Sequence, residues 1–363
     1  MEYYKKILYL LSPQERKNGA LLLTMILIMA FLDMIGVASI LPFMVVLTNP
    51  DIIETNIVLK NMYQISETFG VENNQEFFFV LGILVLLLLL FSLGFKAITT
   101  YVQTRFVLMR EFTIGKRFVK GYLSQPYDWF LNRNSADLGK NILSEVSLLV
   151  GGCISAFMKL IANIAVSVAL VVLLIVTDPK LAIITGLSLG VSYGIIYKLI
   201  HSFLSKIGKQ RLISNQLRFT AISEAFRAIK EVKVGGLEKT YIERFSNPAE
   251  KFAKDVTSQQ VLVLLPRFAL EAIAFGGILL LILYLMKKTG NFNSSLPIIS
   301  LYVFAGYRLL PALQQVYASF SSLTFSGAAL DTMYNELKHL KSTELNQDKD
   351  ILPLKNEIAL KNI

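Results

Sequence analysis

The chain has few of the residues from which most catalytic and metal sites are built. Among its 363 residues there are one cysteine, two histidines and one tryptophan. The single Cys153 excludes an intrachain disulfide framework, and the sequence has no CxxC motif or Cys/His cluster for a metal. The GxxxxGK[ST] loop that cradles nucleotide phosphates is missing as well. We therefore predict no catalytic residue and no metal ligand here.

Charge is also scarce, and acidic charge is the scarcer kind. Charged residues make up 17% of the chain, with 26 Asp and Glu against 36 Lys and Arg, while 54% is hydrophobic. This composition is too apolar for a soluble protein of this length and predicts a membrane protein. In such a protein the net charge of +10 reflects basic loops, so we do not expect nucleic acid as a partner.

Six apolar windows have the length of bilayer-crossing helices. They are approximately Ala20–Thr48, Phe78–Thr99, Ile154–Val176, Leu181–Ile200, Val261–Met286 and the more polar Leu296–Phe320. The first window is longer than the apolar core of a signal peptide, and the residues before it contain no small-residue cleavage site. We therefore expect it to be retained as a transmembrane helix and not cleaved. The predicted fold is an all-α membrane protein with six long transmembrane helices.

The distribution of basic residues predicts the orientation. Six spans put both termini on one side of the membrane. The segments on that side carry most of the Lys and Arg, whereas the opposite loops carry four, namely Lys60, Lys180, Lys287 and Lys288. The positive-inside rule therefore places both termini in the cytoplasm.

Two segments are too long to be simple spans. No proline occurs from Phe78 to Ser124, and apolar residues recur there at helical spacing. At 1.5 Å per residue such a helix is about 70 Å long, against a hydrocarbon core of about 30 Å. Leu181–Ala228 has the same character. We expect both helices to continue into the cytoplasm and to end in tips that can contact a soluble motor.

The first tip is SQPYDWFLNRNSADLGKNILSEV, Ser124–Val146. Pro126 should interrupt the descending helix. Ser135 with Asp137 is typical of the cap of a returning helix. The aromatic residues between them, which predict a compact knob, are Tyr127, Trp129 and Phe130.

The second tip is ISEAFRAIKEVKVGGLEKTYIERF, Ile222–Phe245. Gly235 and Gly236 permit a chain reversal there. An apolar stripe flanked by charge is formed by Phe226, Ile229 and Val232. For both tips the alternative is a plain turn between helices.

At the N-terminus, Glu2–Lys17 pairs apolar with basic residues and predicts an interfacial helix on the inner leaflet. We assign residues 1–19 to this elbow, 20–320 to the membrane domain and 321–350 to a helix end and polar linker.

With these features the sequence resembles the membrane domain of a type IV ABC exporter over essentially its whole length. The motifs PYDWFLNRNSADL and SEAFRAIKEVKVGG carry the resemblance. More narrowly, one subgroup of these exporters, which contains the flippase for lipid-linked oligosaccharides of bacterial protein N-glycosylation, is similar to this chain in the motifs DMIGVASILPF, LLPRFALEAIAFGG and YRLLPALQQV. The resemblance implies a domain-swapped dimer, most simply a homodimer, in a bacterial inner membrane. Its cargo would be an anionic lipid-linked saccharide moved from the cytoplasmic leaflet outward.

The resemblance also implies which residues contact the ATPase domains. The expected coupling residues are Tyr127, Asp128, Trp129 and Phe130 in the first tip and Glu224, Phe226 and Arg227 in the second. ATP and Mg²⁺ would be bound by the nucleotide-binding domain and not by this chain. Residues 351–363, which end in NEIALKNI, resemble the first strand of such a domain, so we expect a longer polypeptide.

Some charges lie inside the predicted spans. Arg267 and Glu271 are four residues apart and can pair on one helix face. Lys96 and Lys159 lie nearer the inner interface, where long basic side chains snorkel to the surface.

Arg308 is different, because no residue three or four positions away can pair with it. Its partner must come from another helix, such as Asp33 or Glu271, from cavity water or from cargo. Gln315 continues a polar stripe from it, which favours a cavity lining. We predict that Arg308 and Arg267, with Gln315 and Glu271, bind cargo, because guanidinium groups bind a pyrophosphate bidentately.

Two other functions fit the same sequence. One is an exporter of peptides or amphipathic small molecules, whose cavity should be more aromatic and less cationic. The other is a membrane scaffold without a motor, for which Ile363 would be the true terminus.

Overall fold

The computed structural model describes residues 2–67, 71, 73–131, 133–289 and 292–340, and within these ranges every regular element is a helix. The α-helices are α1 (Glu2–Leu10), α2 (Pro13–Ala38), α3 (Ile40–Thr48), α4 (Ile52–Thr55), α5 (Ile57–Glu67), α6 (Asn74–Leu123), α7 (Tyr127–Leu131), α8 (Ser135–Lys140), α9 (Val146–Leu149), α10 (Ser155–Thr177), α11 (Pro179–Arg227), α12 (Ile229–Val234), α13 (Glu238–Thr289) and α14 (Phe292–His339). Two π-helical turns, η1 (Asn141–Glu145) and η2 (Val150–Ile154), join α8, α9 and α10.

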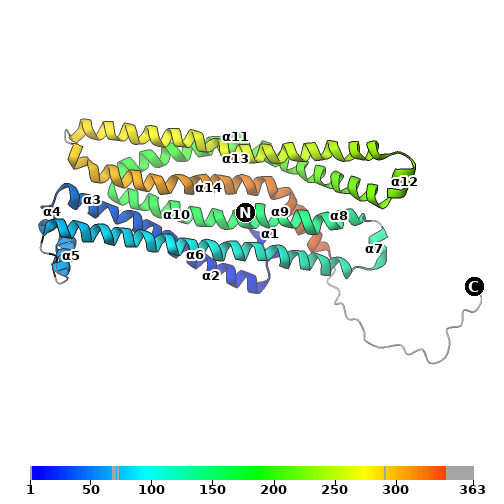
Figure 1. Cartoon of the computed structure of the whole chain (residues 1–363), viewed down its shortest axis with the longest axis horizontal. Helices are drawn as coiled ribbons and strands as arrows, with labels where there is room; N and C mark the ends of the chain where they lie inside the picture. The colour runs from blue at the N-terminus through cyan, green and yellow to red at the C-terminus, as the bar shows by residue number, and fades with distance from the viewer. Residues whose placement is uncertain (1, 68–70, 72, 132, 290–291, 341–363) are drawn as a thin grey trace, which may run out of the picture.

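Long helices lie side by side and give the molecule an elongated shape (Figure 1). The helices α6, α11, α13 and α14 have 50, 49, 52 and 48 residues, so each is about 70–80 Å long. The predicted extension of Phe78–Ser124 and Leu181–Ala228 beyond a membrane span is confirmed as continuous helix.

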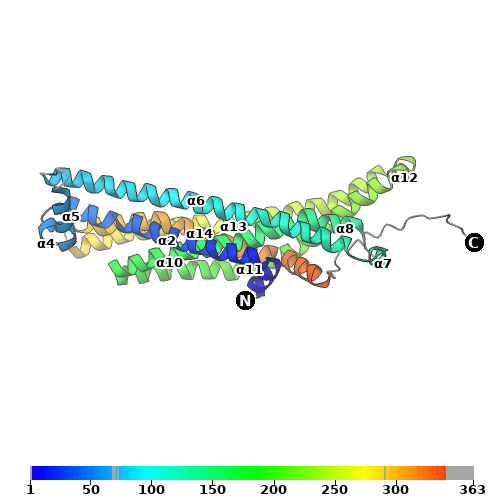
Figure 2. The ribbon, with the colours of Figure 1, turned by 90° about the horizontal axis from the view of Figure 1, so that it is seen from below.

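The two predicted tips lie at one end of the molecule, which we call the tip end. In Figures 1 and 2, α7 and α12 both lie there, whereas α4 and α5 lie at the opposite end. As predicted, α6 ends shortly before Pro126, at Leu123. Gly236 has φ of 62°, the left-handed region that glycine tolerates, and lies in the reversal before α13. The last turn of α14 also reaches the tip end, beside α7.

The elbow is shorter than Glu2–Lys17. Helix α1 ends at Leu10, and α2 begins at Pro13. Ser12 and Glu15 form a capping box, because each side chain hydrogen-bonds the backbone N–H of the other residue. With proline at the first helical position, this box starts a new helix.

The first predicted span, Ala20–Thr48, is divided between α2 and α3 at Ser39. Pro42 explains the break, because it lacks a backbone N–H and its ring conflicts with the carbonyl four residues earlier, that of Ala38.

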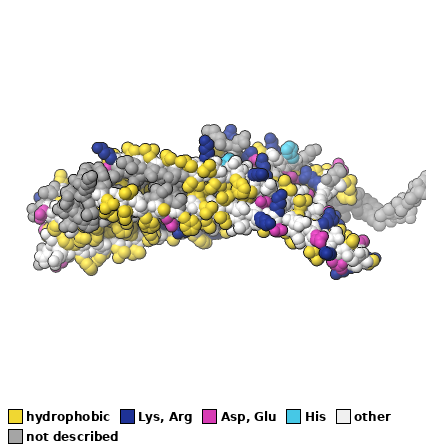
Figure 3. Space-filling view, turned by 90° about the horizontal axis from the view of Figure 1, so that it is seen from above, with side chains coloured by type: hydrophobic (Ala, Val, Ile, Leu, Met, Phe, Trp, Pro, Cys, Tyr) yellow, Lys and Arg dark blue, Asp and Glu magenta, His cyan; other side chains and the backbone are white. Residues whose placement is uncertain are grey.

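Three helical stretches within the described residues are long and apolar enough to cross a membrane: Pro13–Thr48, Asn74–Leu123 and Ser135–Thr177. The other three predicted windows lie in α11, α13 and α14, and a six-span topology stays a prediction. Figure 3 shows hydrophobic side chains over the part away from the tips and most of the charge toward the tip end. On α6 the side chains of Phe79, Leu87 and Phe91 are exposed, which suits contact with lipid.

Helix α14 packs against α10, α11 and α13. At Gly208 in α11, a Cβ would overlap the carbonyl oxygen of Phe325 in α14. A Cβ at Gly152 in η2 would overlap the Ser326 hydroxyl. Glycine at these positions allows α14 to approach both neighbours closely. Residues 321–339 of the predicted helix end and linker continue α14, whereas residues 341–350 of that segment and the predicted strand at 351–363 lie outside the described residues.

Candidate functional site

A buried carboxylate on α2 joins three polar side chains from two other helices. The side chain of Asp33 is 0% exposed. Arg308 Nη1 on α14 donates to Asp33 Oδ1 at 2.7 Å, and Ser92 Oγ on α6 donates to the same oxygen at 2.9 Å. Lys96 Nζ, one turn after Ser92, donates to Oδ2 at 3.1 Å. We call Asp33, Ser92, Lys96 and Arg308 the Asp33 cluster.

The Asp33 cluster places two cations on one carboxylate and carries one excess positive charge. Of the two carboxylates considered from the sequence, Asp33 is the partner of Arg308 in this structure. Lys96 does not simply snorkel to the interface, because its ammonium group pairs with Asp33. The side chain of Lys96 remains 41% exposed and that of Arg308 16% exposed, so the cations are the accessible part of the cluster.

The other predicted cargo residues lie apart from this cluster. Arg267 Nε and Glu271 Oε1 are 2.7 Å apart on α13, which confirms the predicted pairing. Their side chains are 56% and 34% exposed. Gln315 is half-buried on α14, two turns after Arg308. In the part of the chain that the structure describes, no hydrogen bond or ion pair joins Arg267 or Glu271 to the Asp33 cluster.

One part of the first tip is exposed, and another part packs against helix α6. Tyr127 is 79% exposed and Asp128 is also exposed. Trp129 and Phe130 are half-buried and pack edge to face, with ring centroids 5.0 Å apart. Trp129 also lies 5.6 Å from the ring of Tyr122 in α6. The predicted knob therefore presents Tyr127 and Asp128, while Trp129 packs α7 against Tyr122 of α6.

The helix after this tip begins at Ser135, but its cap is one residue earlier than predicted. The side chain of Asn134 accepts a hydrogen bond from the backbone N–H of Ala136 at 3.0 Å. Asparagine serves at this position as well as serine does.

The second tip contains a short helix that sequence analysis did not separate from α11. Glu224, Phe226 and Arg227 lie in the last turns of α11, and α12 follows them. Phe226 is 71% exposed, whereas Val232, predicted on the same stripe, is buried. Val234 on α12 is 83% exposed. The exposed apolar surface of this tip therefore combines the end of α11 with the end of α12.

Polar contacts tie the second tip to the helices around it. Glu224 forms an ion pair with Arg244 of α13 at 3.1 Å. Arg227 donates a hydrogen bond to Ser135 Oγ at the start of α8. These contacts fix the end of α11 relative to both the returning helix α8 and its antiparallel neighbour α13.

The family model of the ABC transporter transmembrane region matches residues 55–307, more than two thirds of the chain. The chain belongs to this family. It is therefore the membrane part of an ABC transporter, and such a part associates with an ABC nucleotide-binding domain and typically pairs with a second membrane region.

Proposed function

We propose that this chain is the membrane half of an ATP-driven flippase that moves an anionic lipid-linked saccharide from the cytoplasmic leaflet outward. It would act as a homodimer in a bacterial inner membrane, with six spans and both termini in the cytoplasm. The observation that carries this proposal is the excess positive charge of the Asp33 cluster, where Arg308 and Lys96 share one buried carboxylate.

An intramembrane cluster with excess positive charge suits a phosphate-bearing headgroup. A guanidinium group binds phosphate oxygens bidentately, and an ammonium group adds a point charge. Without cargo both cations pair with Asp33, so neither is unpaired in the membrane, and one net positive charge is left for an anion. A pyrophosphate can pair with one or both of these cations in place of Asp33, while the polyprenyl tail stays in lipid.

The pair of Arg267 and Glu271 on α13 also belongs to the proposed cargo site. Arg267 is more exposed than Arg308 and its partner Glu271 lies on the same helix, so its guanidinium can reach an incoming headgroup. Gln315 offers a neutral donor and acceptor along α14. In a dimer each of these groups occurs twice, which provides cationic groups from both subunits to one cargo.

ATP would act through the tips. Two nucleotide-binding domains that close on ATP and Mg²⁺ would pull on α7 and α12, and the long helices would carry this movement to the membrane. The residues that we assign to this contact are Tyr127, Asp128, Trp129, Phe130, Glu224, Phe226 and Arg227.

The cargo class is tested with the full-length protein in proteoliposomes. We expect ATP-dependent flipping of a fluorescent polyprenyl-pyrophosphate saccharide, and no flipping of the same saccharide on a neutral polyprenyl ether. Equal flipping of both lipids would contradict the phosphate role. ATP hydrolysis stimulated by amphipathic peptides and not by the pyrophosphate lipid would instead favour a peptide exporter.

The coupling role of the first tip gives a separate prediction. Replacing Trp129 and Phe130 together by alanine should lower the amount of cargo moved per ATP at least tenfold, because α7 loses the Trp129 ring that packs on Tyr122 of α6 and the Phe130 ring that packs on Trp129. Basal ATP hydrolysis should remain. Leu143→Ala, which removes an exposed side chain from η1, is the matched control. Unchanged coupling in the double variant would contradict this role.

A further inference from the structure

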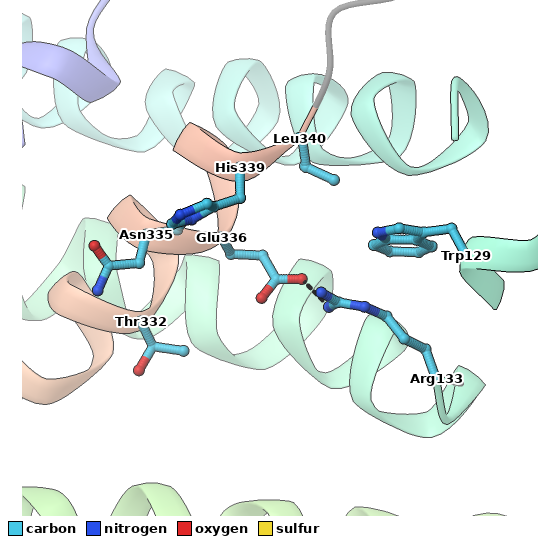
Figure 4. A pocket seen from close by; sticks show the side chains of 7 residues that line it. All are labelled: Trp129, Arg133, Thr332, Asn335, Glu336, His339 and Leu340. Atoms are coloured by element: carbon cyan, nitrogen blue, oxygen red, sulfur yellow. Dashed lines mark hydrogen bonds and ion pairs between the residues drawn. The ribbon is translucent and has the colours of Figure 1, made fainter. Parts of the chain in front are cut away.

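The first tip has an unusual attachment to the rest of the molecule. Helix α7 has five residues, and none of them is buried. Between α7 and the last turns of α14 there is a pocket of about 340 Å³. Figure 4 shows Trp129 and Arg133 on one side of this pocket and Glu336 and His339 on the other. The packed contact of α7 is therefore with α6, through Trp129 and Tyr122, and the pocket separates α7 from the last turns of α14.

One ion pair spans the pocket. Arg133, two residues after α7, places its Nη1 2.5 Å from Glu336 Oε1 on α14. The Arg133 guanidinium also lies over the ring of Trp129, 4.2 Å from its centroid. A guanidinium stacked on an aromatic ring keeps its edge free for a carboxylate, so both contacts can form at once. Arg133 thus joins the aromatic ring of the tip to the end of α14.

Glu336 is itself held in place from α6. The hydroxyl of Tyr122 donates to Glu336 Oε1 at 3.4 Å and accepts a bond from Asn141 Nδ2 at 3.2 Å. Burial raises the pKa of Tyr122, which keeps its phenol protonated as a donor. Leu340 packs on α6 at Gly121, where a Cβ would lie 2.8 Å from its Cδ1. The end of α14 is therefore fixed to α6, and Arg133 fixes α7 to both.

We propose that Arg133 and Glu336 are positioning residues that latch the first tip to the end of α14, so that both move as one body during ATP turnover. Helix α14 is the last helix before residue 341, and α7 is the tip assigned to motor contact. Movement of a nucleotide-binding domain can reach the membrane helices through α7 or through α14. The latch would make these two paths move together. It rests on the association with such a domain and not on the identity of the cargo.

The latch predicts a fixed distance between α7 and the end of α14. Spin labels are attached at Leu131→Cys and Lys338→Cys, both exposed positions outside the residues assigned to motor contact, in the full-length protein with other reactive cysteines replaced. Pulsed electron–electron double resonance in nanodiscs should give one narrow component for the two labels of the same subunit, unchanged between the nucleotide-free state and the ATP/vanadate-trapped state. Arg133→Ala and Glu336→Arg should each widen it at least twofold and lower the transport-to-ATP ratio.

The double variant Arg133→Glu/Glu336→Arg is the control for the ion pair, because it reverses the two charges; it should narrow the distribution relative to either single variant, although it lacks the guanidinium stack on Trp129. A shift of the distance on trapping in the unmodified pair would overturn the latch, since the two elements would then move separately. So would an unchanged width in Arg133→Ala. If Glu336→Arg lowers folded yield, Glu336→Gln, which keeps the side-chain size, provides the same measurement. The distances are measured without cargo, so a wrong cargo class leaves this test intact.

Discussion

Replacing Arg308 by alanine in the full-length protein is expected to abolish flipping of a polyprenyl-pyrophosphate lipid while the protein stays folded. Transport should stop because the more buried of the two cations offered to the headgroup is lost. Folding should survive because Asp33 keeps two partners, the Lys96 ammonium at 3.1 Å and the Ser92 hydroxyl at 2.9 Å. A buried charge that stays paired avoids the main penalty of a broken ion pair.

Asp33→Ala is the contrasting variant. It leaves Arg308 and Lys96 side by side without their common anion. We expect it to cost about 3 kcal/mol of unfolding free energy, the low end for a broken buried pair, because Lys96 is partly exposed. Arg308→Ala should therefore be the more stable of the two variants.

The measurements are flipping in proteoliposomes, basal ATP hydrolysis and thermal unfolding in detergent. Arg308→Lys should retain part of the transport, because it keeps the charge and loses the bidentate geometry. Normal flipping by Arg308→Ala would show that Arg308 acts purely as a structural counter-ion of Asp33. Greater instability of Arg308→Ala than of Asp33→Ala would contradict the charge arrangement described for the cluster.

Features that depend on neighbouring residues in the sequence could be predicted. The proline-free run that forms α6, the interruption near Pro126 and the reversal at Gly235 and Gly236 all follow from local backbone chemistry. The pairing of Arg267 with Glu271 follows from helix geometry in the same way.

Features set by tertiary contacts could not be predicted to the same degree. Spacing could exclude every same-helix partner for Arg308, but choosing Asp33, 275 positions away, needs the packing of α2 on α14. Lys96 pairs with the same carboxylate because α6 lies beside α2. The spacing of residues within either helix does not predict that packing. The break between α11 and α12 falls at Ala228, with φ of −102° and ψ of 34°. No glycine or proline marks it, so the separate helix of the second tip was missed.

The ion pair at Glu145 shows how the helices nearer the tip end are held together. Glu145 lies in η1 and is 0% exposed. Its carboxylate accepts hydrogen bonds from Arg211 Nη1 at 2.7 Å and from Asn215 Nδ2 at 2.5 Å, both on α11. Arg211 and Arg218 of α11 lie over the ring of Phe252 in α13, 5.1 Å and 3.8 Å from its centroid. One carboxylate thus organises contacts among η1, α11 and α13.

Removing the Glu145 carboxylate should lower the unfolding free energy more than any substitution of a surface residue does. Burial and the neighbouring charge of Arg211 lower the pKa of Arg218, and Glu145 opposes this effect. Glu145→Ala would leave Arg211 buried without an anion and close to a second guanidinium. Breaking a buried pair from one side costs about 3–5 kcal/mol, and we expect a loss of this size in unfolding free energy.

The loss is measured by SDS unfolding of the purified full-length protein in mixed micelles. Glu250→Ala is the matched control, because Glu250 pairs with Lys254 on the surface of α13, with side chains 65% and 73% exposed. It should leave the unfolding midpoint unchanged, since exposed pairs contribute little. Glu145→Gln should fall between the two, because the amide keeps hydrogen-bonding capacity and loses the charge. Equal midpoints for Glu145→Ala and Glu250→Ala would contradict this account, since they would mean that α11 is held to η1 by apolar packing and not by the buried ion pair.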